Sequence, residues 1–378
     1  MCGIAGLIDT RLTGQPDRLR ALGQKMAEAL AHRGPDASGV WADAAASLVL
    51  SHRRLSIVDL SAAGAQPMTS ADERWVISFN GEIYNANRIA AAPELAHCNW
   101  RGHSDTEIIL ESFARRGVDA TLADMNGMFA IALWDRRQQT LYLIRDHLGI
   151  KPLYVLEDDG RLAFASELKA FAQLDRWSPQ IDMASVTSFF RFGCVPAPFS
   201  IFKDVRKLMP GEVMTISPGK RPVARRYWSI ATVAELGARS TLDLSDAEAV
   251  RQFDELLSDA VAQQMMSDVP IGAFLSGGID SSTVTACMMQ AGRGPVRTFS
   301  VGSPDLNFDE SRQAAVIAKH LGTDHTELTV TARDAMNTID SLPEMYDEPF
   351  ADSSQIPTFL ISRLTRQYVT VALSGDGG

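Results

Sequence analysis

The fold of the second half of the chain is decided by the stretch Phe274-Leu275-Ser276-Gly277-Gly278-Ile279-Asp280-Ser281-Ser282. The apolar run Ile271–Leu275 predicts a β-strand, and a helix is expected from about Asp280. Two glycines and three hydroxyls at the start of a helix form a cradle of donors for an anion. The stretch lacks the lysine of a Walker-type phosphate loop, so a pyrophosphate group would rest on N–H groups, hydroxyls and Mg²⁺, with Asp280 as the metal carboxylate. A glycine turn that only begins a helix is the alternative reading.

The segments around this stretch alternate between strand and helix patterns. Ser245 and Glu248 have the spacing of a capping box at the start of a helix. Further elements are expected as strands at Val296–Val301, Glu327–Val330 and Tyr368–Leu373 and as a helix at Ser311–Leu321. Such alternation predicts a parallel, doubly wound sheet, in which ligands bind at the carboxyl ends of the strands.

The last predicted strand runs into a second glycine-rich turn, Ser374-Gly375-Asp376-Gly377-Gly378. A doubly wound sheet should continue with a helix after such a turn. We therefore expect this α/β domain to be incomplete.

The first half of the chain reads as strands with few helices. Apolar residues at helical spacing after Pro16 predict one amphipathic helix. Strand patterns fall at Ser47–Val58, Trp75–Phe79, Met128–Trp134, Thr140–Arg145, Pro152–Leu156 and Arg161–Ala165. Two-layer β structure with helices outside is the natural packing for such a chain. We expect a first domain at residues 1–217, a linker at 218–241 without clear periodicity, and a second domain at 242–378.

The bulk composition narrows the class of protein. A length of 378 residues suggests about two domains. The net charge of −10 makes the chain a poor polyanion binder, so nucleic acid is not an expected partner. Its four cysteines, Cys2, Cys98, Cys194 and Cys287, show no metal-binding spacing and fit reduced thiols in the cytoplasm. Neither a membrane span nor a signal peptide is expected.

Cys2 is a candidate nucleophile because only Met1 precedes it. Removal of Met1 would give Cys2 its own α-amino group, whose ordinary pKa is about 7.7–8.0. That amine can take the thiol proton near neutral pH, as in N-terminal threonine nucleophiles. A small buried hydrophobic residue is the alternative on position alone.

A thiolate that attacks an amide needs an oxyanion hole. The Asn80 side chain and the Gly81 backbone N–H are suitable donors after a predicted strand, although Asn-Gly is also a hairpin-turn signal. For an amino-acid substrate, Arg54 can bind the α-carboxylate, and Glu82 and Asp105 can hold the ammonium. Each of these three charges alone could also be a surface ion pair.

Together these segments resemble the glutamine-hydrolysing asparagine synthetases. The matching segments in the first half are MCGIAG at 1–6, HRGPD at 32–36, HRRLSIVD at 52–59, NGEIYN at 80–85, SDTE at 104–107, GMFA at 127–130, RDHLGIKPLY at 145–154 and ASELK at 165–169. Those in the second half are SDVP at 267–270, LSGGIDSS at 275–282 and LSGDGG at 373–378. The resemblance covers essentially the whole chain.

The resemblance implies an α+β N-terminal-nucleophile hydrolase sandwich (αββα) followed by a partial α/β PP-loop ATP pyrophosphatase domain. It implies that Cys2 hydrolyses glutamine through a glutamyl thioester, with Asn80 and Gly81 as the oxyanion hole. The implied glutamine-binding residues are Arg54, Leu55, Ser56, Ile57, Val58, Asn80, Gly81, Glu82 and Asp105.

For the second half, the resemblance implies synthesis of asparagine from aspartate, ATP and ammonia, with Mg²⁺ as cofactor. The implied ATP-binding residues are Leu275, Ser276, Gly277, Gly278, Asp280, Ser281, Ser282, Val301, Ser374 and Gly375. Asp376 would stand where the best-known members carry Glu, at a position important for forming β-aspartyl-AMP. Ammonia would travel inside the protein from the first site to the second. These patterns do not decide the oligomeric state, and a homodimer is compatible with them.

Two alternatives stay open. Related amidotransferases use the same two domains on other carboxylate acceptors. The chain could also be a fragment that hydrolyses glutamine only or is catalytically silent, because family members usually continue beyond this point with helices that complete the ATP and aspartate sites. Intact Cys2, Arg54, Asn80 and Asp105 argue against decay of the first half.

Overall fold

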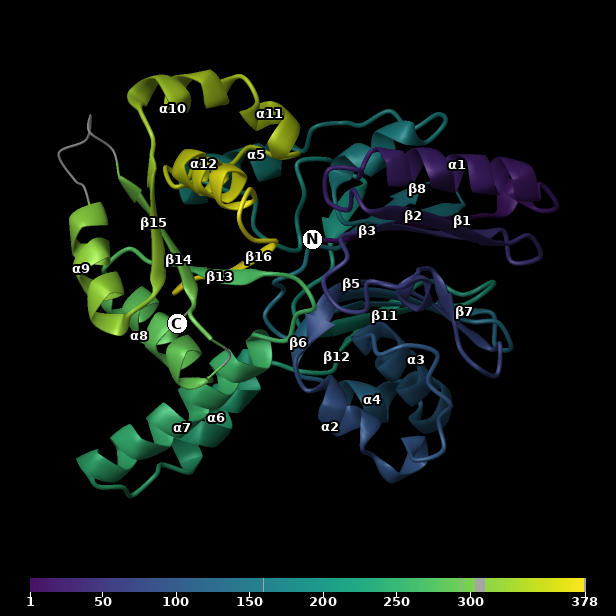
Figure 1. The fold of residues 1–378 in the computed structure, drawn as a ribbon. Helices are drawn as coiled ribbons and strands as arrows, with labels where there is room; N and C mark the ends of the chain where they lie inside the picture. The colour runs from purple at the N-terminus through teal and green to yellow at the C-terminus, as the bar shows by residue number, and fades with distance from the viewer. Residues whose placement is uncertain (159, 293, 303–309, 377–378) are drawn as a thin grey trace. The chain divides into compact units, whose positions relative to one another are not determined.

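The computed structural model describes residues 1–158, 160–292, 294–302 and 310–376. The chain forms two compact units. The first unit contains Met1–Thr241 together with Asp347–Phe350, and the second contains Leu242–Tyr346 and Ala351–Gly378. Figure 1 shows the elements of both units, which we describe separately. Residues 377 and 378, at the end of the predicted second glycine turn, lie outside the described part.

Two six-stranded antiparallel sheets form the centre of the first unit. The order in one sheet is β10-β8-β9-β1-β3-β2, and in the other β12-β11-β7-β6-β5-β4. Strands of the first sheet are β1 (Gly3–Asp9), β2 (Ala37–Asp43), β3 (Leu48–Arg54), β8 (Tyr154–Asp158), β9 (Arg161–Ala165) and β10 (Val205–Lys207). Those of the second are β4 (Met68–Thr69), β5 (Trp75–Ile83), β6 (Gly127–Asp135), β7 (Thr140–Arg145), β11 (Glu212–Ile216) and β12 (Val223–Arg226).

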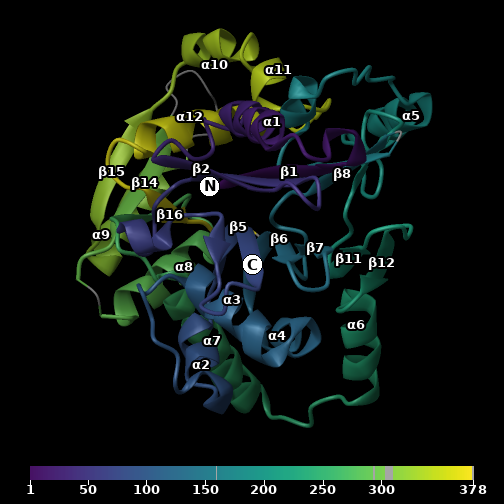
Figure 2. The same ribbon diagram turned by 90° about the vertical axis from the view of Figure 1, so that its right-hand side faces the viewer.

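Helices cover the outer face of each sheet, as the turned view in Figure 2 shows. Leu19, Leu22 and Met26 of α1 pack against one sheet, and Ile109 and Phe113 of α3 pack against the other. A third apolar cluster lies between the sheets. The helices are α1 (Pro16–Glu28), α2 (Ala86–Ala90), α3 (Asp105–Arg116), α4 (Val118–Asp124), α5 (Met183–Phe192) and α6 (Ile230–Arg239), with short 3-10 turns at Thr10–Leu12, Ala62–Gly64, Pro93–Leu95 and Leu168–Gln173. The predicted αββα sandwich is confirmed.

Two local features of this unit differ from what the sequence patterns indicated. The segment 218–241, expected to be a linker, contains β12 and α6. The Ser229 side chain accepts a hydrogen bond from the N–H of Thr232 and so begins α6, whose apolar side chains are exposed. The expected strand Ser47–Val58 ends at Arg54, because the Arg54 guanidinium binds carbonyls of the residues that follow and bends them into a loop.

The second unit contains a four-stranded sheet of order β15-β14-β13-β16, and every pair in it is parallel. Its strands are β13 (Ile271–Phe274), β14 (Arg297–Gly302), β15 (Asp324–Thr329) and β16 (Val371–Leu373), and its helices are α7 (Asp246–Gln264), α8 (Ile279–Gln290), α9 (Ser311–Leu321), α10 (Ala332–Ile339), α11 (Leu342–Met345) and α12 (Gln355–Thr365). The parallel α/β prediction is confirmed.

The direction in which strands are added reverses between β13 and β16. The chain adds β14 and then β15 on one side of β13 and later returns to place β16 on its other side. Open parallel sheets bind ligands at such a switch point, outside the carboxyl ends of the strands. Two strand starts were predicted wrongly. β15 begins three residues before Glu327. β16 begins at Val371 rather than Tyr368, because residues 366–369 form a turn after α12. No helix in the described ranges is both long and apolar enough to span a membrane.

Candidate active site

Cys2 directly precedes β1 and is held from both sides. Its Sγ atom lies 3.4 Å from the N–H of Leu55, which donates to it, and 3.6 Å from the carbonyl oxygen of Leu55. The Nε atom of Arg33 donates a 2.9 Å hydrogen bond to the Cys2 carbonyl. The thiol and the backbone of Cys2 therefore have fixed positions before any substrate binds.

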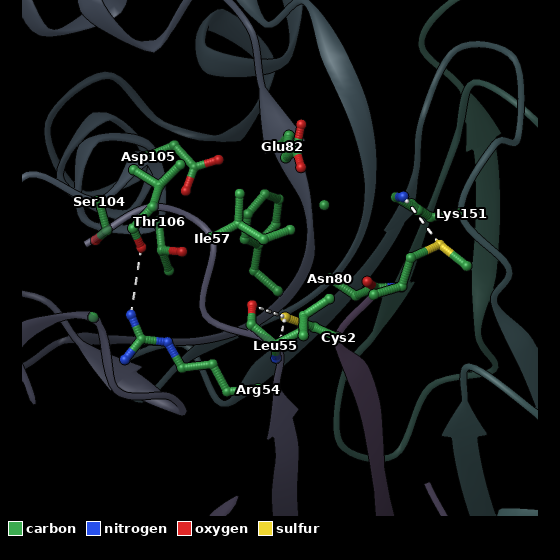
Figure 3. Close-up of a pocket in the computed structure, with 15 residues that line it drawn as sticks. Cys2, Arg54, Leu55, Ile57, Asn80, Glu82, Ser104, Asp105, Thr106 and Lys151 are labelled. Atoms are coloured by element: carbon green, nitrogen blue, oxygen red, sulfur yellow. Dashed lines mark hydrogen bonds between the residues drawn. The ribbon is translucent and has the colours of Figure 1, made fainter. Parts of the chain in front are cut away.

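A pocket opens at Cys2, and its wall comes from both sheets (Figure 3). Cys2 lies at the start of β1, an interior strand of the first sheet, Asn80 and Glu82 lie on β5 of the second, and Asp105 lies in the first turn of α3. The lining residues are Met1, Cys2, Arg54, Leu55, Ile57, Val58, Gly64, Phe79, Asn80, Gly81, Glu82, Ser104, Asp105, Thr106 and Lys151. All but one of the predicted glutaminase residues line it. The exception is Ser56, whose N–H donates to Asp36 at 2.7 Å.

Asn80 brings an unused donor to the pocket. Its residue is 1% exposed, and its Nδ2 atom is buried with no hydrogen-bond partner among the described residues. A buried donor without a partner costs free energy, so such groups need an explanation. Gly81 follows on the same strand, where a side chain would collide with the backbone of β6 at Met128 and Phe129. A negatively charged oxygen of a bound substrate would give the Asn80 amide the hydrogen-bond acceptor that it lacks among the described residues.

Arg54 is 8% exposed, and its guanidinium holds the loop that follows β3. It donates to the carbonyl oxygens of Ser61 at 3.0 Å and Val58 at 3.4 Å, and also to that of Asp59. This use of its donors was not predicted. It shapes the wall formed by Ile57 and Val58, and it places a positive charge in the lining.

Three charged side chains set the electrostatics of the pocket: Asp105 and Lys151 are buried, and Glu82 is half-buried. Burial raises the pKa of Glu82 to about 7 and that of Asp105 to about 6. The Lys151 ammonium opposes the shift of Glu82, and the N–H of Ile83 donates to Asp105 at 2.9 Å and stabilises its charged form. Burial also lowers the pKa of Lys151. Both carboxyls therefore titrate close to neutral pH.

The free amine of the chain lies in the same surroundings. Burial lowers the pKa of the Met1 amino group to about 6, with Cys2 opposing the shift and Arg33 and Lys151 assisting it. Burial raises the pKa of the Cys2 thiol, and the hydrogen bond from Leu55 opposes this. This amine belongs to Met1 and leaves with it, so it is not the base that would act on the Cys2 thiol.

Two residues of this site received no role from the sequence. Lys151 is 5% exposed and its Nζ atom lies 3.3 Å from the Sδ atom of Met1. Arg33 is anchored by Glu167 at 2.7 Å. Both stand within quoted motifs, but neither motif's spacing shows that these side chains turn toward Cys2. Only the fold brings residues so far apart in the chain together.

In the second unit, the two glycine-rich turns lie side by side at the switch point of the sheet. Ala273 of β13 is in register with Leu373 of β16, and Gly375 is packed so closely on the first turn of α8 that a Cβ atom there would lie 2.7 Å from the Ser281 nitrogen. The helix α8 begins at Ile279 without a side-chain cap. Uncapped N–H groups at a helix start favour an anion.

The remaining predicted ATP-site residues surround this edge in different ways. Ser276 and Ser281 share a 3.0 Å hydrogen bond, Ser282 donates to the Gly278 carbonyl at 2.6 Å, and Gly277 has a φ of 83°. Ser374 bonds to Asp376 at 3.1 Å. The Leu275 side chain is buried against α9 rather than open, and Val301 lies near the carboxyl end of β14.

The described residues contain no group of three His, Cys, Asp or Glu side chains that could hold a metal ion. Asp280 is in the first turn of α8 and could supply one carboxylate. Mg²⁺ commonly binds through one or two carboxylates together with substrate phosphates and waters. The donor set therefore fits a metal that arrives with a nucleotide.

Comparison with known proteins identifies both halves. Residues 1–228 match the glutamine amidotransferase domain, and residues 252–378 match the asparagine synthase family. The whole chain aligns at 34% identity with 74% of a putative glutamine-hydrolysing asparagine synthetase of Methanocaldococcus jannaschii. It aligns at 32% identity with 58% of asparagine synthetase 1 of Bacillus subtilis and with 63% of asparagine synthetase B of Escherichia coli. The chain thus spans less than two thirds of the length of several relatives.

A solved structure is also similar in part. The glutamine phosphoribosylpyrophosphate amidotransferase of Bacillus subtilis, complexed with ADP and GMP, is 15% identical, with a TM-score of 0.45, over 87% of this chain and 81% of its own. The sandwich of the first unit is the N-terminal-nucleophile amidotransferase fold to which the family match assigns residues 1–228.

Proposed function

The chain belongs to the family of glutamine-hydrolysing asparagine synthetases, and on that premise we propose that its first unit hydrolyses glutamine at Cys2 and delivers ammonia for amide synthesis. The observation that supports this most directly is the buried Asn80 amide, whose Nδ2 atom has no hydrogen-bond partner among the described residues, in a pocket that also contains the Cys2 thiol.

We infer the following steps after Met1 is removed. The α-amine of Cys2 takes the thiol proton, and the thiolate attacks the side-chain amide carbon of glutamine. The oxygen that becomes negative is bound by Asn80 and by the N–H of Gly81. The amide nitrogen takes the proton held by the Cys2 α-amine and leaves as ammonia. Water then hydrolyses the glutamyl thioester to glutamate.

The rest of the pocket fits an amino acid. The Arg54 guanidinium provides positive charge for the α-carboxylate, although it already donates to three carbonyls of its own loop. Glu82 and Asp105 provide negative charge for the α-ammonium when they are ionised. Leu55, Ile57 and Val58 complete the wall, and Ser56 supports that loop from outside the pocket.

For the second unit we propose ATP binding at the two neighbouring turns and formation of β-aspartyl-AMP from aspartate. The phosphates would meet the start of α8, with Ser276, Gly277, Gly278, Ser281 and Ser282, and with Ser374 and Gly375. Leu275 and Val301 would lie near the nucleotide, Asp280 would bind Mg²⁺, and Asp376 would act on the aspartyl group. ATP makes the carboxylate reactive toward ammonia. Asparagine is the acceptor product that the family suggests, and we expect the protein to act in the cytoplasm.

The test is release of glutamate and ammonia from glutamine by protein whose Met1 has been removed, verified by mass spectrometry. We expect Cys2→Ala to abolish release and Cys2→Ser to leave only a trace. A Cys2→Ala protein with wild-type turnover would refute the assignment. Product analysis with aspartate and other carboxylates, in the presence of ATP, decides between asparagine and another acceptor.

A further inference from the structure

Four residues from far along the sequence, Asp347–Phe350, belong to the first unit although they lie within the asparagine synthase match. Two of them are acidic and largely buried, with side chains 12% and 9% exposed at Asp347 and Glu348. Buried carboxylates are costly unless they are paired and hydrogen-bonded. Their partners therefore show what holds this segment in place.

Each carboxylate has its own lysine. Asp347 accepts a 2.8 Å hydrogen bond from the backbone N–H of Lys169, and the Lys169 Nζ atom lies 3.5 Å away. Glu348 lies 2.9 Å from the Nζ atom of Lys207. Burial raises the pKa of both carboxyls, and the lysines oppose that shift. Lys169 and Lys207 thus form a basic binding site for the acidic dipeptide Asp347-Glu348.

A chain of polar contacts connects Lys169 to Cys2, the proposed nucleophile. Besides Asp347, Lys169 contacts Glu167, with 3.0 Å between Nζ and Oε2. The other oxygen of Glu167 lies 2.7 Å from Nη1 of Arg33, and Nε of Arg33 donates to the Cys2 carbonyl. Burial opposes ionisation of Glu167, but hydrogen bonds from His32 and Arg33 outweigh it and lower its pKa to about 2. Glu167 is thus a fixed anion shared by Lys169 and Arg33.

We propose that the dipeptide Asp347-Glu348 is a docking element. Its ion pairs with Lys169 and Lys207 position the Cys2 backbone through Glu167 and Arg33. The proposal rests on Cys2 being the glutaminase nucleophile. With Asp347 in place, the Lys169 charge is divided between two carboxylates. Without the Asp347 carboxylate, Lys169 interacts only with Glu167 and competes with Arg33 for it. The hydrogen bond from Arg33 to the Cys2 carbonyl then weakens. Neither Asp347 nor Glu348 is among the described residues that line the Cys2 pocket, so the dipeptide is a positioning element.

The first experiment compares Asp347→Asn with the matched control Asp175→Asn in the otherwise unchanged chain. Asp175 forms an exposed ion pair with Arg18 at 3.2 Å. We expect Asp347→Asn to lower kcat for glutamine hydrolysis about 2- to 30-fold with KM nearly unchanged, since the pocket lining is intact. The control should keep wild-type kcat. Wild-type kcat in Asp347→Asn would overturn the proposal.

A double-mutant cycle with Lys169→Gln separates positioning from general destabilisation. If Asp347 acts through Lys169, the double variant loses no more activity than the worse single variant, whereas additive losses contradict the relay. Glu348→Gln leaves the Lys169–Glu167 contact intact but loosens the segment, so a smaller loss of kcat is expected. This variant replaces Asp347→Asn if the latter does not fold, and wild-type kcat in it would then count against the proposal.

A second readout does not depend on glutamine. The rate of Cys2 alkylation by iodoacetamide, followed by mass spectrometry of the Cys2 peptide, reports how the thiol is positioned. We expect a changed rate in Asp347→Asn and an unchanged one in Asp175→Asn. If the wild-type protein does not hydrolyse glutamine, the proposed function fails. If it does, but neither kcat nor alkylation responds to Asp347→Asn, only the docking proposal fails.

Discussion

The Nζ atom of Lys151 lies 3.3 Å from the Sδ atom of Met1, the residue whose removal the proposed mechanism requires. Lys151 also opposes the raised pKa of Glu82. Once Met1 is removed, Lys151 loses the thioether but still acts on Glu82. If glutamine binds in this pocket as proposed, Lys151 influences how that binding depends on pH.

Lys151→Met should weaken glutamine binding near neutral pH. The pKa of Glu82, about 7 in the protein, should rise further, so Glu82 is protonated at pH 7 and cannot hold the substrate ammonium. We expect KM to increase about tenfold at pH 7, the equivalent of about 1.4 kcal/mol, and to recover as the pH is raised toward 8.5. Steady-state kinetics between pH 6 and 8.5 measure this. Lys151→Arg keeps the charge and is the control; an equal rise of KM in both variants would contradict the explanation.

Asn80→Ala should separate catalysis from stability. Its Nδ2 atom has no partner in the described residues, so truncation should cost little folding free energy while kcat falls roughly 10²–10³-fold. The matched control is Asn85→Ala in the same motif. Asn85 donates to the Asp124 carbonyl at 2.7 Å and accepts from the Asn126 N–H at 2.9 Å. Its loss should cost about 1–3 kcal/mol and spare kcat. The opposite pattern in urea unfolding and turnover would remove Asn80 from the oxyanion hole.

His52 should make the first unit sensitive to acid. Its Nε2 atom lies 3.0 Å from the Phe79 carbonyl, and burial lowers its pKa to about 4. The unfolded chain gains a proton near pH 6.5 while the native state does not, so stability present above pH 6.5 is lost progressively down to about pH 4, by up to about 3 kcal/mol. Urea unfolding of His52→Gln at pH 7, 5.5 and 4.5 should show a shallower decline. The exposed His97→Gln is the control and should follow wild type; equal slopes in all three proteins would disprove the link.

Gly375→Ala should disrupt the proposed ATP site. The new Cβ atom would lie 2.7 Å from the Ser281 nitrogen, so one turn must move away from the other. Isothermal titration calorimetry with ATP and Mg²⁺ should show at least a tenfold loss of affinity. Gly237→Ala, where a Cβ atom meets no atom of the described residues within 4 Å, is the control and should bind as wild type does. Unchanged binding by Gly375→Ala would place the nucleotide elsewhere.

Much of the fold was readable because its signals are local. The strand, glycine turn and helix around Ser276 follow from adjacent residues, and they appear as β13 and α8. The helix α6 was missed although Ser229 and the apolar spacing from Ile230 to Leu236 are helix signals; its apolar side chains are exposed in the structure. β15 was placed too late because its first residues are polar, and parallel pairing with β14 rather than hydrophobicity sets where it begins.

The site was less predictable than the strands. Chemistry alone suggested Cys2, Asn80 and Asp105, and the resemblance suggested that they act together. No pattern indicated that Lys151 turns toward Met1 or that the Arg54 donors are used by its own loop. These contacts depend on the stacking of two sheets, which sequence spacing does not encode.

The strand order has a consequence for the protein during its synthesis. Cys2 is synthesised well before β9 at Arg161–Ala165, yet β1, which follows Cys2, pairs on one side with β9. At translation rates of about 5–20 residues per second, the N-terminus waits roughly 8–30 s before its second neighbour exists. A methionine aminopeptidase can act on an open chain end during that interval. In the proposed mechanism, Cys2 is thus synthesised well before its surroundings are complete, so Met1 can be removed before the proposed glutaminase site has formed.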